Sequence, residues 1–302
     1  MKSQITFLGT SSAIPTKTRN HMSILLSYKN ENILIDCGEA TQRQFRKANI
    51  NPCQLTRLLI THFHGDHVFG LPGLFQTLGL NNYQKTLYIY GPKGTKEFIK
   101  KLYETFVHTK KISMIIEEVH GTFVETPDFK ITALPLDHDA PTNGYMFEEK
   151  DKLRIDKNKL KRLKLSEKNP ELGKLAKGLD IKINNKLIKS KDLTYRQKGK
   201  KISFIFDTGL CNNAKNLAKD SDLAIIEATF LENSEDGKEK AKEYRHLTAA
   251  QAGRLAKQGK ANQLILTHFS QRYEHKENLL LQEAKKIFPN TKLAEDLMTL
   301  EI

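Results

Sequence analysis

Residues 61–67 read THFHGDH, which places three histidines and one aspartate in a single heptapeptide. The heptapeptide follows the apolar run at 58–60, which predicts a buried strand of a mixed sheet ending at the first histidine. Four metal-binding side chains this close in sequence cannot all reach one ion without strain, so two neighbouring sites are expected. The expected pairs are His62 with His64 and Asp66 with His67. Imidazole and carboxylate ligands without a thiolate favour zinc in an open, catalytic site.

The composition is that of a globular protein without a membrane span. The chain has 302 residues, 38% hydrophobic content and a mean hydropathy of −0.52, and no apolar stretch approaches the roughly 18 residues that a bilayer requires. This length allows one large α/β domain or two smaller ones. The N-terminus shows no signal-peptide pattern. Cys37, Cys53 and Cys211 are scattered and form no CxxC pair, so we expect a cytoplasmic protein with no thiolate-bound zinc. The lack of a long apolar stretch predicts no membrane partner.

The positive charge is concentrated in one segment. The formal net charge is +14, and positions 150–201 contain 19 Lys or Arg against six Asp or Glu. A long, basic and weakly apolar insertion in a compact enzyme predicts a projecting arm that contacts a polyanion. A merely solvated loop remains an alternative, and charge alone does not distinguish a nucleic acid from an acidic membrane.

Apolar runs alternate with short helical patterns along the rest of the chain. This alternation predicts an α/β protein with two sheets covered by helices and with its functional loops along one edge. The expected strands are Ile5–Leu8, Ser23–Ser27, Asn32–Asp36, Leu55–Ile60, Leu87–Tyr90, Met114–Val119, Phe129–Leu136, Ile202–Phe206, Leu223–Ile226, Leu264–Thr267 and one near the C-terminus. The expected helices are Ala40–Ala48, Thr95–Phe106, Ala249–Gln258 and Asn278–Ile287.

Three later strands also end in possible metal ligands. His138, Asp207 and His268 each follow an apolar run, where a shared active-site edge would place them. Together with the heptapeptide they supply seven ligands. Seven are enough for two ions with one bridging carboxylate and an open position for water.

The pattern at 62–67 matches the HxHxDH signature of the metallo-β-lactamase superfamily, and His138, Asp207 and His268 match its later ligand motifs in order. More closely, the chain resembles the short form of ribonuclease Z, the tRNA 3′-processing endoribonuclease, over its full length. The motifs that carry this resemblance are PTKTRN at 15–20, DCGEATQ at 36–42, GLPGL at 70–74 and HLT at 246–248. The family has Ser at the middle position of the last motif. Its Gly-Pro-rich arm tip is replaced here by NPELGKL at 169–175.

The resemblance implies an αββα sandwich formed by a single domain, 1–302, with 150–201 as a protruding tRNA-binding arm. It implies two zinc ions, one held by His62, His64 and His138 and the other by Asp66, His67 and His268, with Asp207 bridging them. The expected reaction removes the 3′ trailer from precursor tRNA and leaves a 3′-hydroxyl on the tRNA and a 5′-phosphate on the trailer. Asp66 is the expected proton acceptor, and His246, oriented by Glu227, the proton donor.

The same resemblance assigns substrate contacts and partners. The expected contacts are Lys17, Arg19, Asn20, Thr248 and Arg272, the expected substrate is precursor tRNA, and the expected assembly is a homodimer. Three rival functions remain: a hydrolase of cyclic nucleotides, sulfate esters or thioesters; an RNA-binding module without activity; and a membrane-surface protein. The basic segment and the loop at 15–20 disfavour small substrates, the seven ligands disfavour an inactive module, and the absence of an amphipathic aromatic face disfavours a membrane surface.

Overall fold

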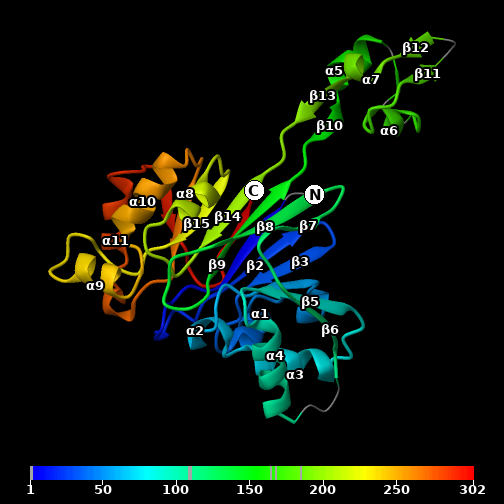
Figure 1. Ribbon diagram of the computed structural model, residues 1–302. Coiled ribbons are helices and arrows are strands. Elements are labelled where there is room, and N and C mark those ends of the chain that lie inside the picture. The colour runs from blue at the N-terminus through cyan, green and yellow to red at the C-terminus, as the bar shows by residue number, and fades with distance from the viewer. Residues whose placement is uncertain (1–2, 108–110, 164, 167–168, 184–185) are drawn as a thin grey trace. The chain divides into compact units, whose positions relative to one another are not determined.

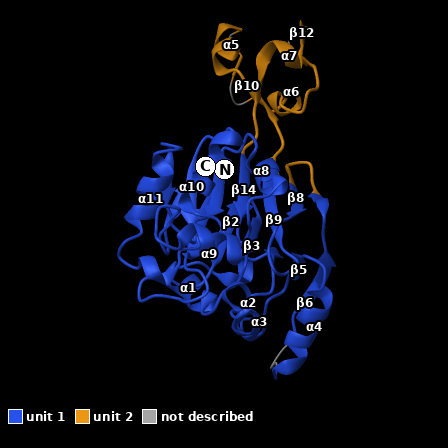
Figure 2. Ribbon diagram, turned by 60° about the vertical axis from the view of Figure 1, so that its left-hand side comes forward, with its two compact units in different colours: residues 1–124, 131–147, 201–302 blue, residues 125–130, 148–200 orange. Residues whose placement is uncertain are grey.

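The computed structural model describes residues 3–107, 111–163, 165–166, 169–183 and 186–302. The chain forms two compact units, shown in different colours in Figure 2. The larger unit comprises residues 1–124, 131–147 and 201–302, and the smaller unit comprises residues 125–130 and 148–200. The smaller unit therefore contains nearly all of the basic segment 150–201.

The first of two seven-stranded sheets has the order β18-β1-β2-β3-β4-β5-β6. Its strands are β1 (Gln4–Gly9), β2 (Ser23–Tyr28), β3 (Glu31–Ile35), β4 (Arg57–Leu59), β5 (Thr86–Gly91), β6 (Ser113–Glu118) and β18 (Thr299–Glu301). Pairing is antiparallel from β18 to β3 and parallel from β3 to β6. The predicted strand Leu55–Ile60 is shorter in the structure, where β4 spans Arg57–Leu59 and follows a 3-10 turn, η1 (Pro52–Gln54).

The second sheet has the order β17-β16-β15-β14-β9-β8-β7. Its strands are β7 (Gly121–Glu125), β8 (Phe129–Pro135), β9 (Asn143–Glu149), β14 (Lys201–Ile205), β15 (Leu223–Glu227), β16 (Leu264–Thr267) and β17 (Thr291–Leu293). β14 to β17 are parallel, and β15 and β16 are buried throughout, as expected for strands covered on both faces. Parallel strands end at the same edge, so the residues that follow β14 and β16 are neighbours.

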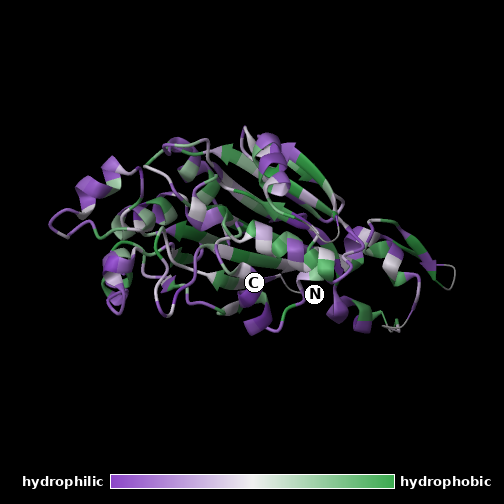
Figure 3. Cartoon of the chain, turned by 90° about the horizontal axis from the view of Figure 1, so that it is seen from below, coloured by the Kyte–Doolittle hydropathy of each residue, from purple (hydrophilic) through white to green (hydrophobic). Residues whose placement is uncertain are grey.

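Helices cover the outer faces of both sheets (Figure 1). α1 (Thr41–Lys47), α3 (Leu71–Leu80) and α4 (Thr95–Thr105) pack on the first sheet, and α8 (Asn212–Ala218), α10 (Ala249–Gln258) and α11 (Asn278–Lys285) pack on the second. The remaining short helices of the larger unit are α2 (Gly65–Val68), α9 (Gly237–Glu243) and η2 (Gln271–Tyr273). Hydrophobic residues concentrate in the strands of the sheets, as Figure 3 shows. The predicted arrangement of two sheets flanked by helices is confirmed.

Across the residues that the structure describes, no helix combines the length and apolar character needed to cross a bilayer.

The smaller unit has its own hydrophobic core. Its elements are β10 (Lys152–Ile155), α5 (Lys157–Arg162), α6 (Leu172–Leu175), β11 (Ile181–Ile183), β12 (Lys186–Ile188), α7 (Ser190–Leu193) and β13 (Thr194–Gln197). Two antiparallel pairs, β10 with β13 and β11 with β12, frame the buried side chains of Leu160, Leu172, Leu175, Ile181 and Leu193. The few apolar side chains of this weakly apolar segment therefore form a core, and the basic segment folds into a defined unit.

Candidate metal centre

The predicted ligands all lie where strands of the two sheets end. His62 to His67 follow β4, His138 follows β8, Asp207 follows β14 and His268 follows β16. Two of them are in the left-handed region of backbone conformation, with φ of 44° at Asp207 and 60° at His268. This conformation is uncommon for residues other than glycine and often marks functional sites.

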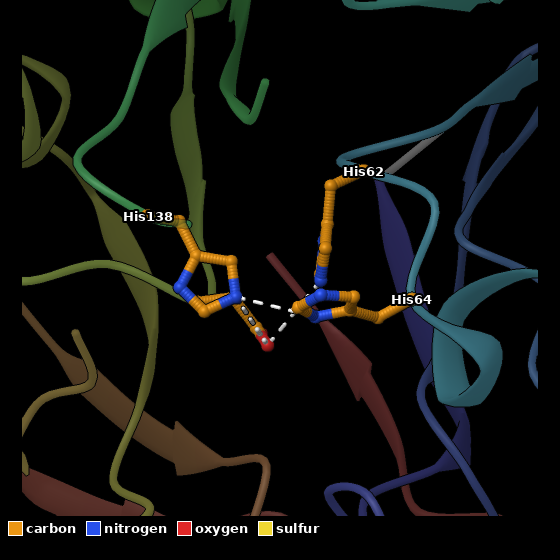
Figure 4. Close-up of side chains that lie close together, drawn as sticks. His62, His64 and His138 are labelled. Atoms are coloured by element: carbon orange, nitrogen blue, oxygen red, sulfur yellow. Dashed lines mark hydrogen bonds and ion pairs between the residues drawn. The ribbon is translucent and has the colours of Figure 1, made fainter. Parts of the chain in front are cut away.

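The first ligand cluster contains His62, His64, His138 and Asp207. Figure 4 shows the three imidazoles pointing toward one another from the loops that follow β4 and β8. His138 Nε2 lies 3.3 Å from His64 Nδ1, and Asp207 Oδ2 lies 3.5 Å from His62 Nε2 and 3.9 Å from His138 Nε2. His62, His138 and Asp207 are buried, and His64 is partly exposed.

The second cluster contains Asp66, His67, His268 and the same Asp207. The Nε2 atoms of His67 and His268 are 3.3 Å apart, and Asp66 Oδ2 lies 3.3 Å from the first and 3.4 Å from the second. Asp207 Oδ1 lies 3.3 Å and 3.2 Å from these two nitrogens. Asp207 therefore presents one oxygen to each cluster, which is the arrangement of a bridging ligand.

These separations fit a metal ion. Zinc bonds of 2.0–2.1 Å in tetrahedral geometry place neighbouring donor atoms about 3.3 Å apart. The donor pairs described above are mostly separated by 3.2–3.5 Å. In addition, His62 Nε2 and Asp207 Oδ1 are buried without a hydrogen-bond partner. Buried polar atoms are normally satisfied, so these two atoms indicate a cation between the side chains.

Hydrogen bonds behind the cluster fix which imidazole nitrogen faces it. Asp36 Oδ2 accepts from His67 Nδ1 (2.7 Å), and the Arg245 carbonyl accepts from His138 Nδ1 (3.2 Å). The Thr61 hydroxyl donates to Asp36 at 2.8 Å and therefore accepts from His62 Nδ1 at 3.0 Å. In the same way, the Thr229 hydroxyl donates to Glu227 at 2.6 Å and accepts from His268 Nδ1 at 2.9 Å. Each of these four histidines therefore turns its Nε2 toward the metal site. His64 differs, because its Nδ1 faces the cluster.

Burial and charge act together on the pKa values of these histidines. Burial lowers the pKa of His62, which keeps its lone pair free for a metal. Burial also acts to lower the pKa of His67, but the carboxylates of Asp207, Asp66 and Asp36 outweigh it and raise that pKa. The carboxylates thus generate a field that draws positive charge into the cluster, as a metal site requires.

His246 lies beside the cluster and is paired with a carboxylate. Glu227 is fully buried, and its Oε2 accepts a hydrogen bond from His246 Nδ1 at 3.0 Å. Its Oε1 accepts from the backbone N–H of Thr208 at 2.7 Å, next to Asp207. Burial would lower the pKa of His246, but the charge of Glu227 raises it to about 9. His246 is therefore protonated at neutral pH and lines the pocket that contains the ligands.

Comparison with known proteins identifies the family. Ribonuclease Z from Methanothermobacter thermautotrophicus is 40% identical over 301 residues, covering 99% of this chain and 96% of that protein. The chain belongs to the ribonuclease Z family. It is a hydrolytic endoribonuclease with a metallo-β-lactamase fold. Ribonuclease Z proteins from Thermobifida fusca (39% identity, 99% of this chain, 94% of that protein) and Chlamydia muridarum (37%, 98% and 96%) are also similar.

Two solved structures and one sequence family add to this comparison. Human short-form tRNase Z superposes with a TM-score of 0.69 at 28% identity and covers 98% of both chains. The metallo-β-lactamase fold protein YhfI from Bacillus subtilis, with a TM-score of 0.71, 17% identity and full coverage of both chains, shows the fold alone. The family described as Anti-Pycsar protein Apyc1 matches residues 3–125, less than half of the chain.

The substrate contacts predicted for this ribonuclease Z divide into two groups. Lys17 is exposed, and Arg272 lines the metal pocket, which has a volume of about 320 Å³. Asn20 is half-buried and donates from Nδ2 to the Glu39 carbonyl at 2.6 Å. Arg272 also donates from Nη1 to Asp236 Oδ1 at 3.3 Å, and the contacts of Lys17, Asn20 and Arg272 with a substrate stay predictions.

Arg19 and Thr248 also make hydrogen bonds within the protein, and their role as substrate contacts stays a prediction. The Arg19 guanidinium donates to Glu277 Oε1 (2.9 Å), the Thr10 hydroxyl (2.7 Å) and the Ala294 carbonyl (2.8 Å). Thr248 is fully buried, and its hydroxyl caps α10 by accepting from the Gln251 N–H at 3.1 Å. Both side chains use polar atoms to hold their own loops in place.

Several residues that shape this site were not predicted. Asp36 lies in the motif at 36–42, but nothing in its sequence context shows that it orients His67. The sequence likewise does not indicate the roles of Thr61, Thr229 and Arg245, because these roles depend on which strands become neighbours. A carboxylate or hydroxyl beside a ligand histidine is a recurring feature of metal sites, and that pattern was the only available signal for Asp36 and Thr61.

Proposed function

We propose that this chain removes the 3′ trailer from precursor tRNA by hydrolysis, leaving a 3′-hydroxyl on the tRNA and a 5′-phosphate on the trailer. The observation that carries the proposal is the pair of ligand clusters joined by Asp207, in a member of the ribonuclease Z family. Membership supports RNA as substrate, and the name of the human neighbour, tRNase Z, supports tRNA.

The proposed cofactor is a pair of zinc ions. His62, His64 and His138 would hold one and Asp66, His67 and His268 the other, with Asp207 shared; the donor separations and the mixture of imidazole and carboxylate ligands support this assignment. Zinc bound there supplies a nucleophilic hydroxide near neutral pH and neutralises charge on the phosphoryl oxygens.

The side chains around the pocket would move the protons. Asp66 belongs to the second cluster, lines the pocket, and would accept the proton of the attacking water. His246 donates its proton to the departing 3′ oxygen, for which its raised pKa suits it. Glu227 is buried and holds the His246 ring in place by accepting the hydrogen bond from His246 Nδ1.

The smaller unit is the proposed grip on the tRNA. Every Lys and Arg that the structure describes between positions 157 and 198 is exposed, so the unit offers a dense set of phosphate contacts. Such contacts position a helix without reading its sequence, which suits recognition of tRNA by shape. Lys17 and Arg272 would contact phosphates near the cleavage site. A homodimer in the cytoplasm remains part of the proposal; the three free cysteines agree with a reducing compartment.

The decisive experiment is cleavage of a 3′-extended precursor tRNA with both new ends mapped. We expect wild-type protein to cut next to the last tRNA nucleotide in a chelator-sensitive reaction and Asp66→Ala to lose at least two orders of magnitude in rate. Asp220→Asn is a matched control, because this aspartate is exposed and belongs to neither cluster. Equal activity of wild type and Asp66→Ala, or cuts far from the tRNA end, would overturn the proposal.

A further inference from the structure

An exposed aromatic side chain stands at the mouth of the metal pocket without a role in the chemistry described so far. Tyr244 is 50% exposed and lines the same pocket as Asp66, Asp207 and His246. Tyr244 directly follows α9, and its backbone N–H donates a helical hydrogen bond to the Lys240 carbonyl at 2.9 Å. Large exposed aromatic side chains beside a reactive centre point to a binding role.

Tyr244 lies on an aromatic and cationic surface. Its ring stacks with that of Phe230, with centroids 6.5 Å apart and planes inclined by 25°. Phe230 is nearly buried, and the Arg272 guanidinium lies 5.0 Å from its ring centroid. We name Tyr244, Phe230 and Arg272 the aromatic shelf. Stacked rings with an adjacent guanidinium are the side chains that proteins use to hold unpaired nucleobases.

The shelf is held at a fixed distance from the ligands. Arg245, the next residue, has a left-handed backbone with φ of 52°. It donates from Nη1 to the His138 carbonyl at 2.8 Å, and its own carbonyl accepts from His138 Nδ1 at 3.2 Å. This reciprocal pair ties the chain at Tyr244 directly to a metal ligand. A base on the shelf would therefore be placed relative to the scissile phosphate by the same contacts that orient the metal site.

The position of His246 decides which base the shelf can hold. His246 is two residues beyond Tyr244, and its ring centroid lies 6.1 Å from that of Phe230. In the proposed reaction His246 protonates the departing 3′ oxygen, which belongs to the last nucleotide of the tRNA rather than to the trailer. The base nearest to the shelf is then the base of that last tRNA nucleotide.

We propose that Tyr244 stacks on the base of the nucleotide immediately 5′ of the cleavage site and so selects an unpaired, splayed-out tRNA end. This inference rests on the proposed function and extends it to a specificity-determining residue. Because every base has a π face, the stacking selects for an accessible end and tolerates all four bases. A base that remains paired in a duplex cannot reach the ring, so double-stranded ends are poor substrates.

The test combines variants of Tyr244 with abasic precursor tRNA. Tyr244→Ala and Tyr244→Leu should lower kcat/KM about 5- to 150-fold, the range that corresponds to loss of one stacked base, whereas Tyr244→Phe keeps the ring and restores the rate. Wild-type protein should lose the same factor on a precursor that is abasic at the last tRNA nucleotide. The two changes together should cost no more than either alone, because they remove the same contact.

The controls separate this inference from the function on which it rests. Phe106→Ala removes an aromatic ring of matched exposure (49%) from the end of α4 and should change nothing. Additive losses from Tyr244→Ala and the abasic tRNA end would overturn the inference, as would non-additivity with an abasic first trailer nucleotide instead. If wild-type protein fails to cut the unmodified precursor at the tRNA end, the proposed function itself fails.

Discussion

The substitution Leu175→Ala separates substrate capture from chemistry. Leu175 is fully buried in the smaller unit, where, among the residues that the structure describes, it belongs to a core cluster with four other buried apolar side chains. Truncating a buried leucine to alanine costs about 2–5 kcal/mol. Whole domains are stable by only about 5–15 kcal/mol, and a unit with so small a core has less to lose, so this change should unfold the smaller unit at ordinary temperatures. The two sheets of the larger unit do not depend on Leu175 and should stay folded.

The assay measures precursor tRNA cleavage and metal content for the same preparation. We expect KM to rise at least tenfold and its dependence on salt to flatten, because phosphate contacts are lost, while the bound metal stays at the wild-type level. Leu179→Ala is the matched control, since this leucine lies in the same unit but is 56% exposed. When unfolding is followed during heating, the transition of the smaller unit should be present in wild type and Leu179→Ala and absent from Leu175→Ala. If that variant binds precursor tRNA like wild type after its smaller unit has unfolded, the unit does not grip the substrate.

Three further outcomes are expected. Asp36→Asn keeps a residue that tolerates the left-handed backbone but removes the carboxylate that accepts the hydrogen bond from His67. Metal affinity, measured by a competition titration with a chelator, should therefore fall about 10- to 100-fold. Unchanged affinity would contradict the role of Asp36. Glu227→Gln removes the charge that raises the pKa of His246. Because protonated His246 acts as the acid, kcat of the variant should begin to fall at a lower pH than kcat of wild type. An identical dependence of kcat on pH in the two proteins would exclude a role of Glu227 in raising the pKa of His246. Removing metal with a chelator should lower the melting temperature of the larger unit and leave the transition of the smaller unit in place, since the metal binds only the folded clusters.

The fold and the ligands were largely predictable because their signals are local. Apolar runs at Leu223–Ile226 and Leu264–Thr267 mark buried strands whatever their neighbours are, and a histidine directly after such a run reaches the edge of the sheet. The motif at 62–67 and the later ligands in order then defined the family. Helix α3 was missed since its two glycines disfavour a helix in isolation, and packing of its apolar face overrides that preference.

The internal hydrogen bonds of Arg19 could not be predicted because its partners lie far away in the sequence, whereas the cap that Thr248 forms with Gln251, three positions later, is a local pattern. Arg19 is held by Glu277, 258 positions later, and by the Ala294 carbonyl. A basic residue in a loop near an active site has the same appearance whether it faces RNA or its own C-terminal segment. The basic segment 150–201 was similarly ambiguous, because its leucines form a core only once the β10–β13 and β11–β12 pairs bring them together.

The left-handed backbone at Asp36, Asp207 and His268 sets activity against robustness in this protein. Each non-glycine residue in this conformation lowers the free energy of unfolding by about 1–3 kcal/mol, and packing of the surrounding sheets must offset this loss. Glycine at 207 or 268 would relax the chain while abolishing a ligand. The active enzyme is therefore not the most stable sequence for this fold, because the conformations that position these side chains carry a cost in stability.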